Sequence, residues 1–295
     1  MQIYGIHGTF LDIFKSVYGQ LKSRVKINGG LSRQFECTVG TRQGCISLPV
    51  IISLFINDLV KYIRQTCETG IFVSQDIEEL YACVFVDDVS SLADNVRNVQ
   101  QQIHCIANYC WENVLGLNID KSKIMVFRNE GQVKTFEIWT FNGHDLEVIS
   151  FYKYMCAMFT SKLSWTKTRD VLAKQANKAV LNILKYQKYF APVEVFKLFD
   201  ILVLPILCYS SEIWGYDYSE TIEKVHADLC KRVCCLHQNV CNFLPISECV
   251  RTPISIVYMS GCVKYWAMLT QMQTHRYPKQ CYNVLRNLDN VGRVM

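Results

Sequence analysis

The apolar positions of the first 127 residues follow helical spacing in some stretches and strand spacing in others. Helical spacing places Phe10, Ile13, Phe14, Val17 and Leu21 on one face of residues 9–22. Short strands are predicted on both sides of Gly29-Gly30 and at residues 81–86, 89–93 and 121–127, and helices at about 49–64 and 97–115. This order predicts an α+β fold in which a mainly antiparallel sheet is flanked by helices.

The pattern becomes purely helical after about residue 163. Leu172, Ala176 and Ile183 fall on one face of residues 165–188, with lysines on the other face. Further helical patterns are found at 193–203, 219–237 and 257–273. We therefore predict two domains, a sheet-containing one over 1–163 and an all-helical one over 164–295.

Two adjacent carboxylates, Asp87 and Asp88, lie in CVFVDDVSSLAD, residues 83–94. Asp is common in tight hairpin turns because its side chain bonds its own backbone. A turn needs only one acid, however, and residues 71–94 contain no Lys or Arg to offset the charge. Mg²⁺ is often held by one or two carboxylates together with substrate phosphates. From this stretch alone, a turn and a metal site both remain open.

A glycine-flanked loop precedes the helix predicted at 49–64. Arg42 and Gln43 offer hydrogen-bond donors to phosphates or base edges, and Gly40 and Gly44 allow the backbone to approach a ligand closely. Together with the acidic hairpin about forty residues later, this loop suggests a nucleotide phosphate near a divalent metal.

Charge is distributed unevenly along the 295 residues. The chain has 31 Lys and Arg against 26 Asp and Glu, a net charge of +5. Residues 1–45 carry six Lys or Arg against two acids, and residues 161–200 carry eight against three. Such basic segments fit a nucleic-acid partner, although solvated helix faces give the same pattern.

Fifteen cysteines, with no apparent signal peptide, predict reduced thiols in an intracellular protein that is not secreted. The most apolar window, residues 46–56, is too short to span a membrane. The densest cysteine cluster comprises Cys230, Cys234, Cys235, His237 and Cys241. Its spacing follows one helix instead of two spaced ligand pairs, so buried packing is favoured over a zinc site.

Several motifs in order resemble the reverse transcriptase of non-LTR (LINE-type) retrotransposons. They are YGIHGTFLDIFKSVYGQLKSRVKING, GTRQGCISLPVIISLFINDL, CVFVDDVSSLAD, LGLNIDKSKIMVF and FYKYMCAMFTSKLSW, followed by LFDILVLPILCYSSEIWG and KYWAML. The resemblance implies a partial polymerase palm over 1–163 and a helical, thumb-like region over 164–295. It implies an RNA-directed DNA polymerase with an RNA template, a DNA primer, dNTPs and two Mg²⁺ (or Mn²⁺) ions.

The resemblance also assigns roles to individual residues. It makes Asp87 and Asp88 the catalytic metal ligands. It places Arg42, Gln43, Gly44 and Phe85 beside the nucleotide and template. Lys121 or Lys123 would be a proton donor near the pyrophosphate, although either could equally be a solvated lysine.

The chain departs from the family pattern at several points. The family has a further metal-binding aspartate on a strand upstream of the YGIHG segment, inside which this chain begins, and the fingers precede that segment. Ser47-Leu48-Pro49 stands where Leu-Ser-Pro is usual, and Cys156 stands where a turn glycine is expected. Two functions therefore remain open: an RNA-directed DNA polymerase domain, or a catalytically inactive remnant that at most binds nucleic acid. For this chain alone, we expect weak metal binding and no polymerisation.

Overall fold

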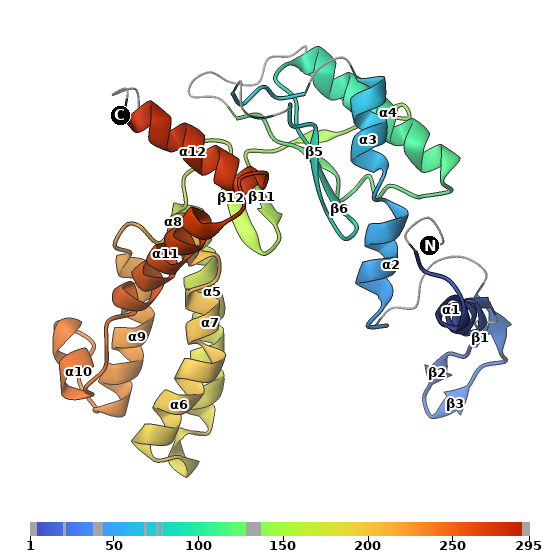
Figure 1. The fold of residues 1–295 in the computed structure, drawn as a ribbon. Coiled ribbons are helices and arrows are strands. Elements are labelled where there is room, and N and C mark those ends of the chain that lie inside the picture. The colour runs from blue at the N-terminus through green and yellow to red at the C-terminus, as the bar shows by residue number, and fades with distance from the viewer. Residues whose placement is uncertain are drawn as a thin grey trace. The chain divides into compact units, whose positions relative to one another are not determined.

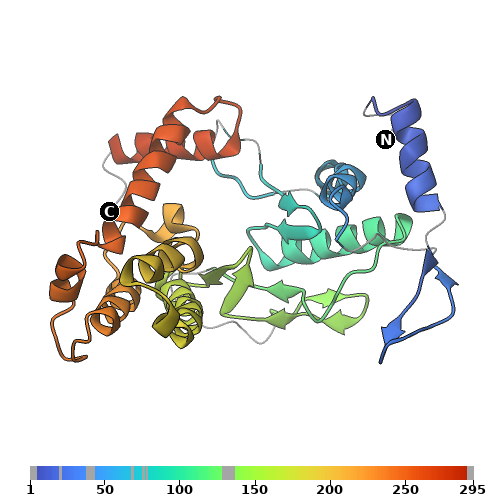
Figure 2. The same cartoon turned by 90° about the horizontal axis from the view of Figure 1, so that it is seen from below.

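The computed structural model describes residues 5–19, 22–37, 44–67, 70–74, 77, 79–127 and 137–290. Helices and short strands both occur along them, which confirms the α+β class (Figures 1 and 2). The chain forms two compact units: unit 1 comprises 1–71 and 79–116, and unit 2 comprises 72–78 and 117–295. The predicted domains, a palm over 1–163 and a thumb-like region over 164–295, remain a prediction.

Unit 1 begins with a helix, continues with short strands, and ends with three helices around a hairpin. Its described elements are α1 (Thr9–Gly19), β1 (Lys22–Ser23), β2 (Lys26–Ile27), β3 (Gly30–Leu31), β4 (Phe35–Glu36), α2 (Leu48–Phe55), α3 (Leu59–Thr66), β5 (Ala82–Phe85), β6 (Asp88–Ser91) and α4 (Val96–Glu112). The helix predicted over residues 9–22 is confirmed as α1. Its apolar face stays largely uncovered by the described residues, since Phe10, Ile13 and Val17 are 58%, 56% and 47% exposed.

The prediction of a single helix over 49–64 is wrong, because the chain forms α2 and α3 with a break at residues 56–58. Asn57 and Asp58 have short polar side chains that compete for backbone hydrogen bonds and disfavour a helix interior. The hydroxyl of Tyr109 on α4 donates a 2.6 Å hydrogen bond to Asp58 Oδ1. Asp58 is therefore held at the break by a residue far away in the sequence.

The core of unit 1 lies among α3, α4 and β5. Its buried residues are Leu59, Ile63, Cys67, Tyr81, Ala82, Cys105 and Tyr109. The helix predicted over 97–115 is confirmed as α4, and the Asn95 side chain caps it by accepting the Asn98 N–H at 2.9 Å. This core fixes the base of the hairpin that carries the paired aspartates.

Unit 2 starts with short strands and continues as helices. Its described elements are β7 (Lys123–Ile124), β8 (Thr140–Phe141), β9 (His144–Asp145), β10 (Glu147–Val148), β11 (Phe151–Tyr154), β12 (Ala157–Thr160), α5 (Thr166–Lys185), η2 (Gln187–Tyr189), α6 (Pro192–Leu202), α7 (Leu204–Leu207), α8 (Ser211–Trp214), α9 (Glu220–Val233), α10 (Phe243–Glu248), α11 (Ile254–Gln271) and α12 (Tyr277–Asn290). The helices predicted at 165–188, 193–203, 219–237 and 257–273 are confirmed as α5, α6, α9 and α11, although α9 ends at Val233, before the predicted end. None of the described helices has the length and apolar character that crossing a bilayer requires.

The strands pair only in twos within the described residues. They form six two-stranded ladders, of which five are antiparallel and β7–β10 is parallel. The mainly antiparallel pairing is confirmed, but the described residues do not join the ladders into one sheet. No described strand exceeds four residues. Each strand therefore contributes little of the apolar surface that stabilises a wide sheet. The strand predicted at 121–127 is reduced to the two residues of β7.

The helices of unit 2 share one large core. Phe199, Leu207, Trp214 and Ile222 are completely buried in it. The apolar face predicted for α5 is confirmed, since Leu172, Ala176 and Ile183 are buried in the same core. The opposite, lysine-bearing face of α5 is consequently directed to solvent.

Candidate active site

The hairpin β5–β6 presents Asp87 and Asp88 at its tip. Phe85 pairs with Asp88 as the last pair of the ladder, so the two-residue turn is Val86–Asp87. The expectation that both aspartates form the turn is therefore wrong by one position, because Asp88 is the first residue of β6. Val86 has a φ of 55°, a left-handed conformation that is uncommon for a β-branched residue. Strain of this kind concentrates at functional turns.

A buried glutamine fastens the base of this hairpin to α4. Gln102 is 1% exposed, and its Nε2 donates to the carbonyl of Leu92 at 2.9 Å. Its Oε1 accepts a hydrogen bond from the Ser91 hydroxyl at the end of β6. The backbone N–H of Leu92 donates to the carbonyl of Tyr81 at 2.7 Å. The hairpin thus extends from a fixed base, which Figure 1 shows beside α4.

The tip of the hairpin is open to solvent. Asp87 and Asp88 are exposed, and Phe85 is 54% exposed. Among the described residues, no three His, Cys, Asp or Glu side chains gather to form a metal site. The donor chemistry nevertheless suits Mg²⁺, which one or two carboxylates can hold together with substrate phosphates. Two carboxylates alone leave most coordination positions of the ion to other oxygen ligands.

The glycine-flanked loop is described in part. Arg42 and Gln43 lie outside the described residues. Gly44 has a φ of +83°, a conformation that favours glycine, and a Cβ built there would meet no atom within 4 Å. The glycine is therefore explained by backbone conformation, and the open space around it is compatible with close approach of a ligand.

Sequence reasoning missed a polar cluster beside this loop. The Cys45 Sγ lies 3.0 Å from Ser47 Oγ and accepts a hydrogen bond from the Tyr18 hydroxyl at 3.2 Å. The hydrogen bond with Ser47, followed by that from Tyr18, lowers the pKa of the Cys45 thiol to about 7. The Cys-x-Ser spacing was visible in the sequence, but nothing in the sequence indicated that Tyr18 would join it.

The two candidate lysines belong to unit 2 and differ in their surroundings. Lys123 Nζ lies 2.8 Å from Glu147 Oε2, across the β7–β10 ladder. Lys121 is exposed, and its ammonium group has no hydrogen bond or ion pair within the described residues. Its backbone is held in place, because its N–H donates to Asn118 Oδ1 at 3.1 Å and its carbonyl accepts from the Tyr152 hydroxyl at 2.9 Å. Within the described residues, Lys121 therefore has the freer ammonium group of the two.

A line of lysines follows the exposed face of α5. Lys167, Lys174, Lys178 and Lys185 are exposed, and their spacings of seven, four and seven residues keep them on one side of the helix. At 1.5 Å per residue, this lysine stripe is roughly 27 Å long. Lys162 lies in the turn before this helix and is not part of the stripe.

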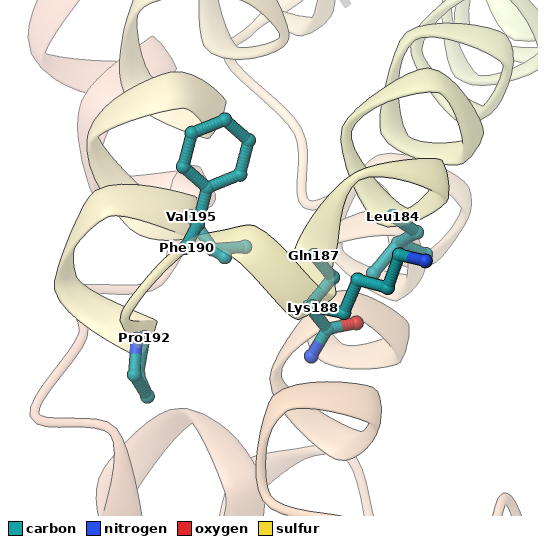
Figure 3. Close-up of a pocket in the computed structure, with 6 residues that line it drawn as sticks. All are labelled: Leu184, Gln187, Lys188, Phe190, Pro192 and Val195. Carbon is teal, nitrogen blue, oxygen red and sulfur yellow. The ribbon is translucent and has the colours of Figure 1, made fainter.

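A pocket of about 500 Å³ lies beyond the end of α5, between α5, η2 and α6 (Figure 3). Its lining residues are Leu184, Gln187, Lys188, Phe190, Pro192 and Val195. This lining contains no carboxylate, thiol or imidazole, and Lys188 is its charged residue, so it provides no set of metal ligands.

The cysteine cluster does not follow one helix as predicted. Helix α9 ends at Val233, and Cys235 has a φ of 54°. The N–H of Leu236 donates a hydrogen bond to the carbonyl of Lys231 at 2.8 Å. This bond is typical of a helix that ends with a residue in the left-handed conformation. Cys230 lies on α9, whereas Cys241 lies beyond the turn.

The sequence pattern of the reverse transcriptase (RNA-dependent DNA polymerase) family matches residues 3–175, more than half of the chain. The chain belongs to the reverse transcriptase family. It is also 25% identical, over 134 residues, to the transposon TX1 uncharacterized 149 kDa protein of Xenopus laevis. That stretch covers 45% of this chain and 10% of the relative. The family match includes the Asp87–Asp88 hairpin, Lys121, Lys123 and the first half of α5.

Proposed function

We propose that this chain provides the metal-binding hairpin and part of the nucleic-acid-binding surface of an RNA-directed DNA polymerase from a non-LTR retrotransposon. The observation that carries the proposal is the family match over residues 3–175, with Asp87 and Asp88 at the exposed tip of a hairpin. An RNA template, a DNA primer and dNTPs would be its substrates.

At the hairpin, Asp87 and Asp88 would hold Mg²⁺ or Mn²⁺ together with the nucleotide phosphates. Such an ion, when bound, activates the primer hydroxyl and stabilises charge on the transferring phosphoryl group. The tie of Gln102 to Ser91 and Leu92 supports this role, because it holds both carboxylates on a fixed base. Phe85, exposed beside them, would contact the nucleotide or template.

Two further regions would serve substrate binding. The backbone at Gly44 would approach the nucleotide, with Arg42 and Gln43 as donors by family resemblance. Lys121, whose ammonium has no partner among the described residues, would protonate the departing pyrophosphate. The lysine stripe of α5 would follow a phosphate backbone.

A second candidate function is an inactive remnant that binds nucleic acid. Catalysis by two metal ions about 4 Å apart requires ligands on both ions. Within the described residues, no cluster of three or more potential ligands forms around the hairpin. For the 295-residue chain by itself we therefore expect binding of a primer–template without extension.

Primer extension separates the two functions. The purified chain is incubated with poly(A)–oligo(dT), dTTP and Mg²⁺ or Mn²⁺, and compared with Asp87→Asn/Asp88→Asn. The exposed Asp12→Asn on α1 is the matched control. Incorporation that is lost in the double variant but kept in the control would establish the polymerase and overturn the remnant. Hybrid binding without incorporation would favour the remnant, and the absence of both binding and incorporation would contradict both functions.

A further inference from the structure

Three thiols meet where α9 and α10 end. Cys234 directly follows α9, and Cys249 directly follows α10. Their sulfur atoms are 3.2 Å apart, although the residues are 15 positions apart in sequence. The thiol of Cys230, on the last turn of α9, also contacts that of Cys249. The two helix ends therefore bring together thiols that the sequence does not visibly pair.

The surroundings hold this pair in place. Ala227, Cys230 and Ile246 form a small buried cluster between α9 and α10, with Cys249 packed against it. Arg251, two residues beyond Cys249, makes a bidentate ion pair with Asp200 on α6. The contact between the sulfur atoms is thus a feature of two packed helix ends.

The same cluster is a poor metal site. Among the described residues no group of three His, Cys, Asp or Glu side chains is arranged to hold an ion. Cys235 and Cys241 are exposed, and the His237 Nδ1 accepts a hydrogen bond from the Asn239 N–H at 3.2 Å. Two thiols in contact can instead be oxidised together to a disulfide.

We propose that Cys234 and Cys249 are a reversible redox pair, which a small-molecule disulfide such as oxidised glutathione converts to an intramolecular disulfide. In the first step, the Cys234 thiol loses its proton and its sulfur attacks the small disulfide, releasing one small thiol. In the second step, the Cys249 sulfur loses its proton and attacks the Cys234 sulfur of the mixed disulfide, releasing the other. The two protein thiols lose two electrons, and the small disulfide gains them as two thiols.

Burial raises the pKa of the Cys249 thiol to about 11, so its thiolate is scarce at neutral pH and the second step is slow. The contact between the sulfurs compensates by making the attack intramolecular. Both thiols are partly exposed, which gives the oxidant access. The disulfide would close a loop of about 15 residues and raise the melting temperature by roughly 5–10 °C.

The chain contains an internal comparison. Cys67 and Cys105 also contact each other, but both are buried in the core of unit 1. An oxidant that reaches Cys234 does not reach them in the folded protein. The proposal therefore predicts selectivity between two thiol pairs, and it stands independently of polymerase activity.

The test treats the full chain with oxidised glutathione, blocks the remaining thiols with an alkylating agent and maps disulfide-linked peptides by mass spectrometry. We expect a link between the segments containing Cys234 and Cys249 that dithiothreitol reverses. Cys235→Ser, the matched control at the adjacent exposed thiol, should keep the link, and Cys249→Ser should lose it. If Cys249→Ser does not fold, mapping of the wild-type chain and Cys235→Ser still decides the matter. Mixed disulfides alone, a link that requires Cys235, or preferential linkage of Cys67 to Cys105 would overturn the proposal.

Discussion

The carboxylate of Glu223 on α9 accepts the backbone N–H of Ile254, the first residue of α11, at 3.1 Å. It also accepts the N–H of Ser255 at 3.0 Å. The first N–H groups of a helix have no acceptor within that helix. Pro253, the residue before α11, has no polar side chain with which to cap it. A carboxylate that is 4% exposed therefore caps a helix 31 residues away.

Replacing Glu223 should consequently destabilise unit 2. Glu223→Ala would leave the buried N–H of Ile254 and the partly buried N–H of Ser255 without an acceptor, and we expect a loss of about 2–4 kcal/mol in the free energy of unfolding. Urea denaturation followed by circular dichroism measures this loss. Glu220→Ala, at an exposed position on the same helix, should change the free energy by less than about 0.5 kcal/mol. Equal effects of the two substitutions would show that the cap is unimportant.

The same carboxylate should make stability depend on pH. Burial raises the pKa of Glu223, but contact with His226 and the hydrogen bonds from Ser255 and Ile254 outweigh it, so the pKa lies below its usual value of 4.5. A lowered folded-state pKa stabilises the fold above pH 4.5, and this contribution is lost as the pH falls through the folded-state value. The difference in unfolding free energy between the wild type and Glu223→Gln should thus be constant above pH 4.5 and shrink below it. Urea titrations from neutral to acidic pH test this, and a difference that grows on acidification would contradict it.

Local patterns predicted the elements well but not the contacts between distant segments. The α5 face containing Leu172, Ala176 and Ile183 followed directly from helical spacing. The break between α2 and α3 did not, because Asp58 at the break is held by the hydroxyl of Tyr109, 51 residues later in the sequence. Short polar residues at 57–58 were a weak signal that a run of apolar residues outweighed.

At the candidate site, too, local features were predictable and contacts with distant residues were not. The hairpin around Asp87 was predictable because two apolar runs flank polar turn residues. Its anchoring by Gln102 was not, since a buried glutamine is indistinguishable from a surface one in the QQQ run of α4. The turn register also escaped prediction, because Asp is a common turn residue and Val is not, yet Val86 occupies the left-handed position.

Cys156 allows a test of turn strain in the β11–β12 hairpin. Met155 and Cys156 have φ values of 47° and 66°, and the left-handed conformation is unfavourable for both side chains. Cys156→Gly should raise the free energy of unfolding by about 0.5–1 kcal/mol. Lys153→Gly, inside the adjoining strand, should lower it by a similar amount. Thermal or urea unfolding of both variants gives the comparison, and destabilisation by Cys156→Gly would refute the assignment of strain.

The Asp87–Asp88 pair should bind Mn²⁺ weakly. Two exposed carboxylates without a third protein ligand should give a Kd on the order of 1 mM. The paramagnetic enhancement of the relaxation rate of water protons measures Mn²⁺ binding to the purified chain. Asp87→Ala/Asp88→Ala should abolish it, whereas Asp12→Ala should not. Undiminished binding in the double variant would place the ion elsewhere and leave the aspartates with a structural role in the hairpin.

The lysine stripe of α5 should bind the backbone of an RNA–DNA hybrid. Each phosphate contact releases condensed counterions, so the logarithm of affinity falls with the logarithm of salt concentration by about one unit of slope per contact. Lys174→Gln/Lys178→Gln removes two neighbouring charges from the middle of the stripe without touching the buried face. We expect the slope, measured by fluorescence anisotropy over a series of salt concentrations, to become shallower by about two.

The matched control is Lys197→Gln/Lys224→Gln, which removes two exposed charges from α6 and α9. It has the same net charge as the stripe variant, so a general attraction between a basic protein and a polyanion would change both slopes equally. If the lysine stripe contacts phosphates, only the slope of the Lys174→Gln/Lys178→Gln variant becomes shallower. Equal slopes in the two variants, or an affinity that does not depend on salt in the wild type, would show that α5 does not hold nucleic acid.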